Sequence, residues 1–252
     1  MLSDEDLLRY SRHILLNEID VVGVERIKRS TVLIVGVGGL GSIAALYLAA
    51  SGVGEIYLVD DDQIDLTNLQ RQVAFTTDAI GLNKAKACQE TIQKINPSVT
   101  VRVYSERFSE TLGESLLEKT DVVLDCSDNF STRHLLNRLC VKHMTPLISG
   151  AAIRFDGQLT VFDARQSTNP CYECLFPDTG NAQEEACATM GVLSPLVGMI
   201  GSAQAVEALK IIMGIGQPLV GRLILFNALS FETQQIRYRQ DPSCKVCAQQ
   251  AN

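Results

Sequence analysis

VLIVGVGGLG, residues 32–41, joins an apolar, β-branched run to a turn that contains four glycines. The run begins at Thr31 (TVLIV, 31–35) and is apolar on both faces, which is typical of a strand in the middle of a parallel sheet. A helix of small residues (40–50) and a second apolar run, EIYLV at 55–59, follow it. Strand, glycine turn, helix and strand form a βαβ unit, and its right-handed crossover places both strands in one sheet. The sequence therefore predicts an α/β fold with a doubly wound, mostly parallel, Rossmann-like sheet.

The same alternation continues along the chain, and no repeat or linker indicates a domain boundary. The patterns predict helices over 3–17, 84–95, 131–142 and 202–213, further strands over 100–104, 121–124 and 146–149, and later, partly antiparallel strands over 157–162 and 222–226. We therefore expect residues 1–252 to form one domain. Its parts are a helical arm (1–20), a nucleotide-binding part (30–150) and a partly antiparallel C-terminal extension (151–252).

The composition indicates a globular protein and shows no basic segment that would bind nucleic acid or an anionic membrane surface. The 252 residues are 46% apolar and 20% charged, with a net charge of −7 and no basic run. We therefore expect neither nucleic acid nor a membrane surface as a partner. Residues 30–54 carry no charge, but their glycines suit a phosphate turn better than a membrane span. The N-terminal stretch lacks the basic start and apolar middle of a signal peptide, which predicts a cytoplasmic protein.

The glycines of the turn predict a phosphate site. Gly36, Gly38 and Gly41 fit the G-x-G-x-x-G pattern, with Gly39 as an extra glycine. Such a turn leaves space for a ligand phosphate against the backbone N–H groups of a helix N-terminus. Asp60 ends the second strand, where its carboxylate can accept hydrogen bonds from ribose hydroxyls. These residues alone favour a nicotinamide-dependent oxidoreductase, with an adenine-nucleotide site or a purely structural glycine turn as alternatives.

Cationic residues after the second strand favour ATP chemistry instead. Cleaving ATP between its α and β phosphates builds negative charge on the α-phosphoryl oxygens and on the departing pyrophosphate. Arg71 in TNLQRQ (67–72), Lys84 and the arm residue Arg12 are candidates to neutralise that charge. A redox cofactor has little use for such cations.

The stretch DCSDN (125–129) directly follows a predicted buried strand, at the sheet edge where open α/β proteins bind ligands. Asp128 could hold Mg²⁺ beside the phosphates. The alternative is that Asp128 or Asn129 only caps the helix that follows.

Two C-x₂-C pairs predict a metal site. Cys171 and Cys174 form one pair, and Cys244 and Cys247 form the other. Four thiolates saturate a tetrahedral Zn²⁺ ion and leave no position for a substrate, so the predicted role of the zinc is structural. A thioredoxin-like redox motif is the alternative, but it needs only one such pair.

A resemblance to a known family spans nearly the whole chain. It is carried by RYSRHILL, GVGGLG, DDDQIDLTNLQRQ, DCSDN, SGAAIRFDGQLTVF, CYECLFPD and CKVC. The chain resembles the MoeB/ThiF family, whose members are related to the adenylation half of ubiquitin-activating enzymes. The resemblance implies an enzyme that binds ATP and Mg²⁺ and adenylates the C-terminal Gly-Gly carboxylate of a small ubiquitin-like sulfur-carrier protein. Pyrophosphate is released, and a separate sulfur donor then converts the carrier to a thiocarboxylate.

The resemblance also implies roles for individual residues. The candidate nucleotide-binding set is Gly36, Gly38, Gly39, Gly41, Asp60, Thr67, Asn68, Leu69, Gln70, Arg71, Lys84, Asp128 and Asn129. Arg12 is implied to reach into the site of a partner subunit, which makes the expected unit a homodimer. The four paired cysteines match the zinc ligands of the family. Residues 151–252 are then the carrier-binding and zinc-binding part.

Three further positions bear on the resemblance: Cys187, Asn83 and Asn227. Cys187 matches a cysteine that can form a covalent link to the carrier in this family, but no cation or histidine nearby in the sequence lowers the pKa of its thiol. Asn83 stands where the family has proline, and Asn227 stands where it has aspartate.

The sequence has features of two branches of the family, which act in different pathways. SGAAIRFDGQLTVF and GQPLVGRLILF favour the molybdopterin branch, whereas RYSRHILL and the acids at 60–62 resemble the thiamine branch. We expect adenylation of the molybdopterin-type carrier, with the thiamine-type carrier as the alternative. A nicotinamide oxidoreductase and a nucleotide-sensing binding module are the alternatives of another class. In adenylation the carboxylate is already a nucleophile, so it needs positioning and charge neutralisation but no general base.

Overall fold

The computed structural model describes residues 2–178 and 190–248. Its centre is an eight-stranded sheet with the order β3-β2-β1-β4-β5-β6-β7-β8. The strands are β1 (Thr31–Val35), β2 (Glu55–Val59), β3 (Thr100–Tyr104), β4 (Val122–Asp125), β5 (Leu147–Ile153), β6 (Asp156–Phe162), β7 (Arg222–Asn227) and β8 (Glu232–Arg237). The strands from β1 to β5 are parallel, and β6, β7 and β8 continue the sheet in antiparallel pairing. The predicted fold class is therefore confirmed.

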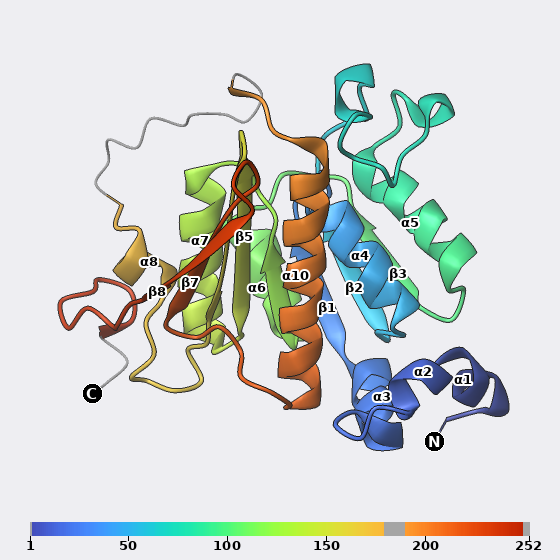
Figure 1. Ribbon diagram of the computed structural model, residues 1–252, viewed down its shortest axis with the longest axis horizontal. Coiled ribbons are helices and arrows are strands. Elements are labelled where there is room, and N and C mark those ends of the chain that lie inside the picture. The colour runs from blue at the N-terminus through green and yellow to red at the C-terminus, as the bar shows by residue number, and fades with distance from the viewer. Residues whose placement is uncertain (1, 179–189, 249–252) are drawn as a thin grey trace.

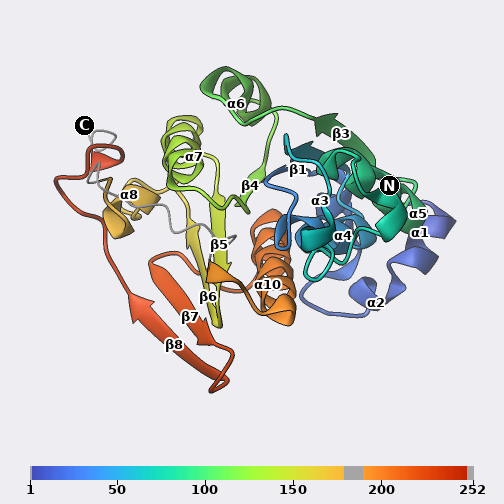
Figure 2. The same ribbon diagram turned by 90° about the horizontal axis from the view of Figure 1, so that it is seen from above.

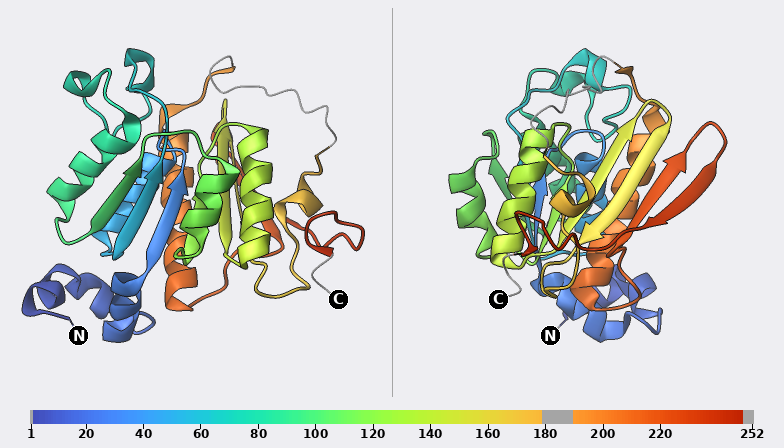
Figure 3. Two further views of the ribbon diagram at one scale, coloured as in Figure 1. Left: turned by 180° about the vertical axis from the view of Figure 1, so that it is seen from behind. Right: turned by 90° about the vertical axis from the view of Figure 1, so that its left-hand side faces the viewer.

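Helices cover both faces of the sheet, as Figure 2 shows from above. The longer helices are α3 (Asp20–Arg29), α4 (Gly41–Ala50), α5 (Lys84–Ile95), α6 (Glu110–Leu117), α7 (Phe130–His143) and α10 (Ser194–Met213). The short ones are α1 (Asp4–Arg9), α2 (Ser11–Ile14), α8 (Tyr172–Leu175) and the 3₁₀ turns η1 (Leu66–Asn68) and η2 (Thr77–Ala79). Helices α4, α5 and α10 lie on one face, and α6 and α7 lie on the other (Figures 1 and 3).

Strand β1 shows why the central strands are apolar on both sides. Val32 and Ile34 are fully buried in the cluster with α4, α5 and α10. Leu33 and Val35 point the other way, into the cluster with α6 and α7. Because side chains alternate between the faces of a strand, only an uninterrupted apolar run can fill both layers.

Helix α10 begins at Ser194, earlier than the predicted start at 202. Pro195 occupies the first turn, where a missing N–H is tolerated. A side chain at Gly201 would overlap the Leu40 carbonyl oxygen, so this glycine serves close packing and does not end the helix. By length and composition α10 could cross a membrane, but 56% of its apolar window is buried inside the molecule, largely against α4 and β5.

The predicted N-terminal arm is two short helices rather than one. Ser3 and Asp6 form a capping box at the start of α1, and Asp6 also pairs with Lys28 of α3 at 2.5 Å. The hydrogen bond from Lys28, with one from the Ser3 backbone, lowers the pKa of Asp6 to about 2. The helices α1 to α3 lie beyond the amino ends of the parallel strands (Figure 3). The arm is thus fastened to the end of the molecule opposite the glycine turn.

Candidate nucleotide and zinc sites

A cavity of about 610 Å³ lies at the carboxyl ends of the parallel strands. Its volume is in the range of sites that enclose a small ligand. Its wall brings together the predicted residues Gly36, Gly38, Gly39, Asp60, Asn68, Arg71, Lys84, Asp128 and Asn129. Of the other predicted residues, Arg12, Gly41, Thr67, Leu69 and Gln70 do not line it, and Cys187 lies outside the described residues.

The glycine turn allows the backbone to fold tightly between β1 and α4. Gly36 has a φ of +88°, and a Cβ there would lie 2.6 Å from the Cys126 carbonyl oxygen. Gly41 has no room for a side chain either, because a Cβ would overlap the Gly36 carbonyl oxygen. Helix α4 starts at Gly41 without a side-chain cap. The Ser42 N–H donates to the Gly38 carbonyl oxygen, whereas the N–H groups of Gly41 and Ile43 have no backbone partner among the described residues. Leu40, directly before the helix, lines the cavity, so the start of α4 lies beside it and can still receive an anion there.

Asp60 directly follows β2 and holds the glycine turn. Its Oδ2 accepts a hydrogen bond from the Val37 N–H at 2.6 Å, and its Oδ1 accepts one from the Asp62 N–H at 2.9 Å. Burial raises the pKa of Asp60, and these two hydrogen bonds oppose that rise. The carboxylate is therefore fixed at the cavity wall between β2 and the glycine turn.

The cationic side of the cavity comes from the start of α5 and from the segment after η1. Lys84 is 8% exposed, and its Nζ lies 2.6 Å from the carboxylate of the exposed Asp62. Arg71 Nη1 donates to the Thr67 carbonyl oxygen at 3.0 Å. Asn68 Oδ1 accepts from the Asp65 N–H within η1. The fold thus brings a lysine and an arginine to one wall, as the sequence predicted.

Asp128 and Asn129 have different surroundings. The Oδ1 of Asn129 accepts the Thr132 N–H at 2.9 Å, so Asn129 is the N-cap of α7. Asp128 is exposed to the cavity, and within the described residues its carboxylate makes no hydrogen bond or ion pair. The capping alternative thus fits Asn129, whereas Asp128 keeps a carboxylate available for a cation.

One buried ion pair at the cavity was not predicted. Arg133 of α7 lies 3.8 Å from the Oδ2 of Asp125, which is fully buried, and Arg133 Nη2 donates to the Ser127 carbonyl oxygen at 2.6 Å. The pair fixes the loop that carries Asp128. In the sequence Arg133 resembles any charged residue of a helix, and the acid at the end of the preceding strand was its only signal. Gln72 also lines the cavity and was likewise absent from the predicted set.

The four paired cysteines meet in one cluster between α8 and the C-terminal segment. All their Sγ atoms lie within 4.8 Å of one another. The closest pairs are Cys171–Cys174 at 3.9 Å, Cys171–Cys244 at 3.6 Å and Cys174–Cys247 at 3.4 Å. Four sulfur atoms about 2.3 Å from a tetrahedral Zn²⁺ would lie about 3.8 Å apart. The cluster therefore fits zinc, as its spacing predicted.

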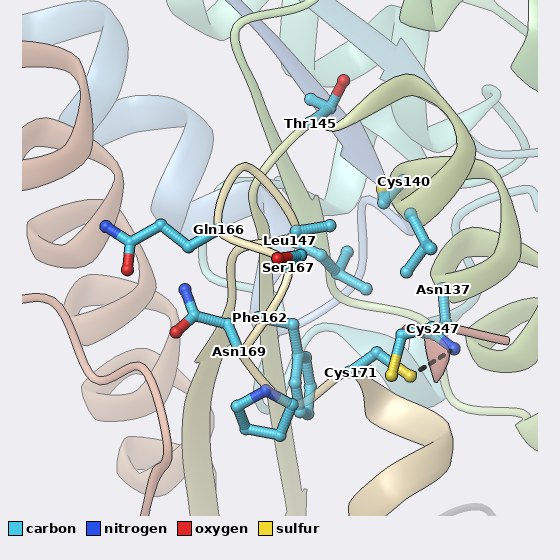
Figure 4. A pocket seen from close by; sticks show the side chains of 13 residues that line it. Asn137, Cys140, Thr145, Leu147, Phe162, Gln166, Ser167, Asn169, Cys171 and Cys247 are labelled. Carbon is cyan, nitrogen blue, oxygen red and sulfur yellow. Dashed lines mark hydrogen bonds between the residues drawn. The ribbon is translucent and has the colours of Figure 1, made fainter. Parts of the chain in front are cut away.

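Hydrogen bonds to the sulfur atoms support the same conclusion. Asn137 of α7 donates to the Sγ of Cys171 at 3.6 Å, and Figure 4 shows this contact beside Cys247. The Asp241 N–H donates to the Sγ of Cys174 at 3.4 Å. Burial raises the pKa of Cys171, so a thiolate at this position needs a bound cation at neutral pH. The two hydrogen-bond donors, the Asn137 side chain and the Asp241 N–H, would orient and stabilise such thiolate ligands.

Comparison with known proteins places these sites in a family. The model of the ThiF family matches residues 10–246. The molybdopterin-synthase adenylyltransferase of Salmonella typhimurium is 41% identical over 248 residues, covering 98% of this chain and 99% of that protein. The sulfur carrier protein ThiS adenylyltransferase of Escherichia coli is 42% identical over 246 residues, covering 98% and 97%. The crystal structure of E. coli MccB with ATP has a TM-score of 0.80 at 25% identity, covering 95% of this chain and 74% of that one. The protein belongs to the ThiF family.

Proposed function

We propose that this protein uses ATP to adenylate the C-terminal carboxylate of a small sulfur-carrier protein, with the molybdopterin-type carrier as the expected substrate. The observation that carries the proposal is the convergence of Arg71, Lys84 and Asp128 on one cavity beside a glycine turn. A hydride-transfer enzyme would leave these charged groups without a role. The near full-length similarity to two sulfur-carrier adenylyltransferases and the likeness to ATP-bound MccB support the same chemistry.

The residues divide the work of adenylation among them. The glycine turn and the start of α4 receive phosphoryl oxygens, and Asp60 is placed to accept hydrogen bonds from the ribose. A carboxylate oxygen of the carrier attacks the α-phosphorus, the bond to the β-phosphate oxygen breaks, and pyrophosphate leaves with the electron pair. Arg71 and Lys84 neutralise the charge that develops on the leaving group. Asp128 would hold Mg²⁺, which shields the phosphate charge when bound.

The carrier tail has a separate approach to the phosphates. The cavity continues along Gly150, Ala151 and Ala152 of β5, which present little or no side chain. A Cβ at Gly150 would lie 2.5 Å from the Gln204 side chain, so the wall is already close-packed behind it. A tail of two glycines could lie against this wall, because neither side of the contact carries a large side chain. We therefore assign residues 30–150 to the nucleotide and residues 151–252 to the carrier and zinc, within a single domain.

Other parts of the proposal concern groups outside the cavity. Zn²⁺ held by the four paired cysteines would brace α8 against the C-terminal segment. Arg12 lies on α2, beyond the amino ends of the strands, and does not line the cavity of its own chain. We therefore propose a homodimer in which each subunit supplies Arg12 to the other. We propose Cys187 as the candidate for the covalent link to the carrier. The sulfur donor would be a separate protein. The expected compartment is the cytoplasm.

The test is ATP–pyrophosphate exchange with Mg²⁺ and each purified carrier in turn, molybdopterin-type and thiamine-type. The matched control is the same carrier without its terminal glycine. Exchange with the intact molybdopterin-type carrier alone is the expected result. Exchange with only the thiamine-type carrier would confirm the adenylation reaction but assign the protein to the thiamine pathway. ATP binding without exchange on either carrier would contradict adenylation and favour a nucleotide-sensing module, and tight NADH binding would favour an oxidoreductase.

A further inference from the structure

Gln72 carries an amide that the fold leaves without partners. The residue follows Arg71 directly, is 3% exposed and lines the cavity. Its Oε1 is buried and accepts no hydrogen bond. Its Nε2 makes no hydrogen bond within the described residues either, so both ends of the side-chain amide are unpaired.

Such an amide is unfavourable in the protein alone. A buried polar group without a partner loses its hydrogen bonds to water and gains nothing in return, so most buried amides are paired. Two amides elsewhere in the described residues are paired: the fully buried Gln204 donates to the backbones of β4 and β5, and the half-buried Gln89 donates to the Val101 carbonyl oxygen at 2.9 Å. The exception at Gln72 lies at a ligand cavity, which points to a partner that arrives with the ligand.

The position of the amide indicates which part of a nucleotide it would meet. A Cβ built on Gly38 would lie 3.4 Å from Gln72 Nε2, so the amide stands beside the middle of the glycine turn. The preceding residue of the turn, Val37, donates its N–H to Asp60. Gln72 Nε2 therefore lies beside the glycine turn, which suits phosphate, one residue from the point where the turn is bonded to Asp60, the carboxylate that suits the ribose.

We propose that Gln72 binds ATP at the junction of its ribose and its phosphates. Phosphoryl oxygens only accept hydrogen bonds, so this junction offers an acceptor to Gln72 Nε2, the end of the amide that lies beside Gly38. The inference rests on the proposed function, since it requires ATP as the ligand. It adds a neutral binding residue next to the cations Arg71 and Lys84.

The test compares the free energy of folding with the affinity for ATP in matched variants. Gln72→Met keeps the length of the side chain and removes the unpaired amide. We expect its unfolding midpoint without nucleotide to be equal to or higher than that of the unsubstituted protein, and its Kd for ATP to rise about tenfold or more. Gln72→Glu places a negative charge beside the phosphates and should raise the Kd further. Gln89→Met, the control, loses a paired amide outside the cavity, so its unfolding midpoint should fall while its Kd stays unchanged.

The result that overturns the inference is an unchanged Kd for ATP in Gln72→Met. Binding is measured by calorimetry without a carrier, so the outcome does not depend on adenylation. An unsubstituted protein that binds ATP but shows no exchange would refute the proposed function and leave the assignment of Gln72 standing. An unsubstituted protein that binds no ATP would refute both.

Discussion

Replacing Asn83 should separate two contributions to stability beside the nucleotide site: the hydrogen bonds of its side chain and the conformation of its backbone. The Oδ1 of Asn83 accepts from the Lys86 N–H at 3.2 Å, which caps α5, and from the Ser105 hydroxyl at 3.0 Å. Its Nδ2 donates to the carbonyl oxygens of Asp60 at 2.9 Å and Asp62 at 3.1 Å. One amide thus ties the end of β2 to the start of α5 and to the end of β3.

The magnitude follows from these contacts. Loss of an N-cap lowers stability by about 1 kcal/mol, and loss of the half-buried bond to Asp60 lowers it by about 1 kcal/mol more. We therefore expect Asn83→Ala to lower the free energy of unfolding by about 2 kcal/mol. Asn83→Pro loses the same side-chain bonds, but the φ of −63° suits proline and the backbone N–H of Asn83 makes no hydrogen bond in the described structure. A stiffer unfolded chain then restores about 0.5–1 kcal/mol.

Urea unfolding of the three proteins and calorimetric titration with ATP provide the measurement. We expect the unsubstituted protein to be the most stable, the proline variant to be less stable, and the alanine variant to be the least stable. Both variants should bind ATP more weakly, because Lys84 and Asp60 lose a common support. An alanine variant within about 0.5 kcal/mol of the unsubstituted protein would refute the role of the side chain. A proline variant less stable than the alanine variant would refute the backbone conformation on which the comparison depends.

Three further perturbations have defined outcomes. Cys174→Ser should abolish zinc binding, measured by elemental analysis, and lower the unfolding temperature; unchanged zinc content would exclude this cysteine as a ligand. In the folded protein the pKa of Asp6 is about 2, below its ordinary value of 3.8. Its pairing with Lys28 therefore stabilises the fold fully above about pH 5, and this stabilisation, at most about 2 kcal/mol, is lost as the pH falls from 4 to 2. Asp6→Asn should remove the loss of stability that protonation of Asp6 causes between pH 5 and 2. If the variant and the unsubstituted protein lose the same stability over this range, the role of the Asp6–Lys28 pair is contradicted. Arg71→Ala and Asp128→Ala should each lower pyrophosphate exchange about a hundredfold or more with little change in stability, and full activity in either variant would remove that residue from the mechanism.

The elements that the sequence predicted best are those with a clear apolar period. The strands at 31–35, 55–59 and 100–104 and the helix at 84–95 have the predicted bounds. An uninterrupted apolar run marks the first two strands, alternation marks 100–104, and a helical period marks 84–95. Strand β8 was not predicted, since Glu232–Arg237 is exposed along its whole length and shows no apolar alternation. Its conformation comes from pairing with β7, which a local pattern cannot reveal.

The candidate site was predictable to the extent that local spacing carries its chemistry. The glycine turn and the two cysteine pairs are short motifs, and their residues meet where the motifs require. Arg133 and Gln72 depend on burial instead. Whether an arginine on a helix faces water or a buried aspartate, and whether a glutamine finds a partner, is decided by packing between segments that are distant in the chain.

The stretch TNLQRQ shows how packing then separates support from function. The hydroxyl of Thr67 and the Oδ1 of Asn68 are engaged with Asp65, the N-cap of η1, and Leu69 packs against the main core. The carbonyl oxygen of Gln70 accepts the Ser194 hydroxyl at the start of α10. These residues fix the segment with bonds that a ligand could not use without breaking the fold. Groups at the cavity that keep unused hydrogen-bonding capacity among the described residues include the amide of Gln72, the carboxylate of Asp128 and the Nδ2 of Asn68. Because the fold gains nothing from leaving them unpaired, their common position at one cavity is the strongest physical argument that a polar, phosphate-bearing ligand completes this site.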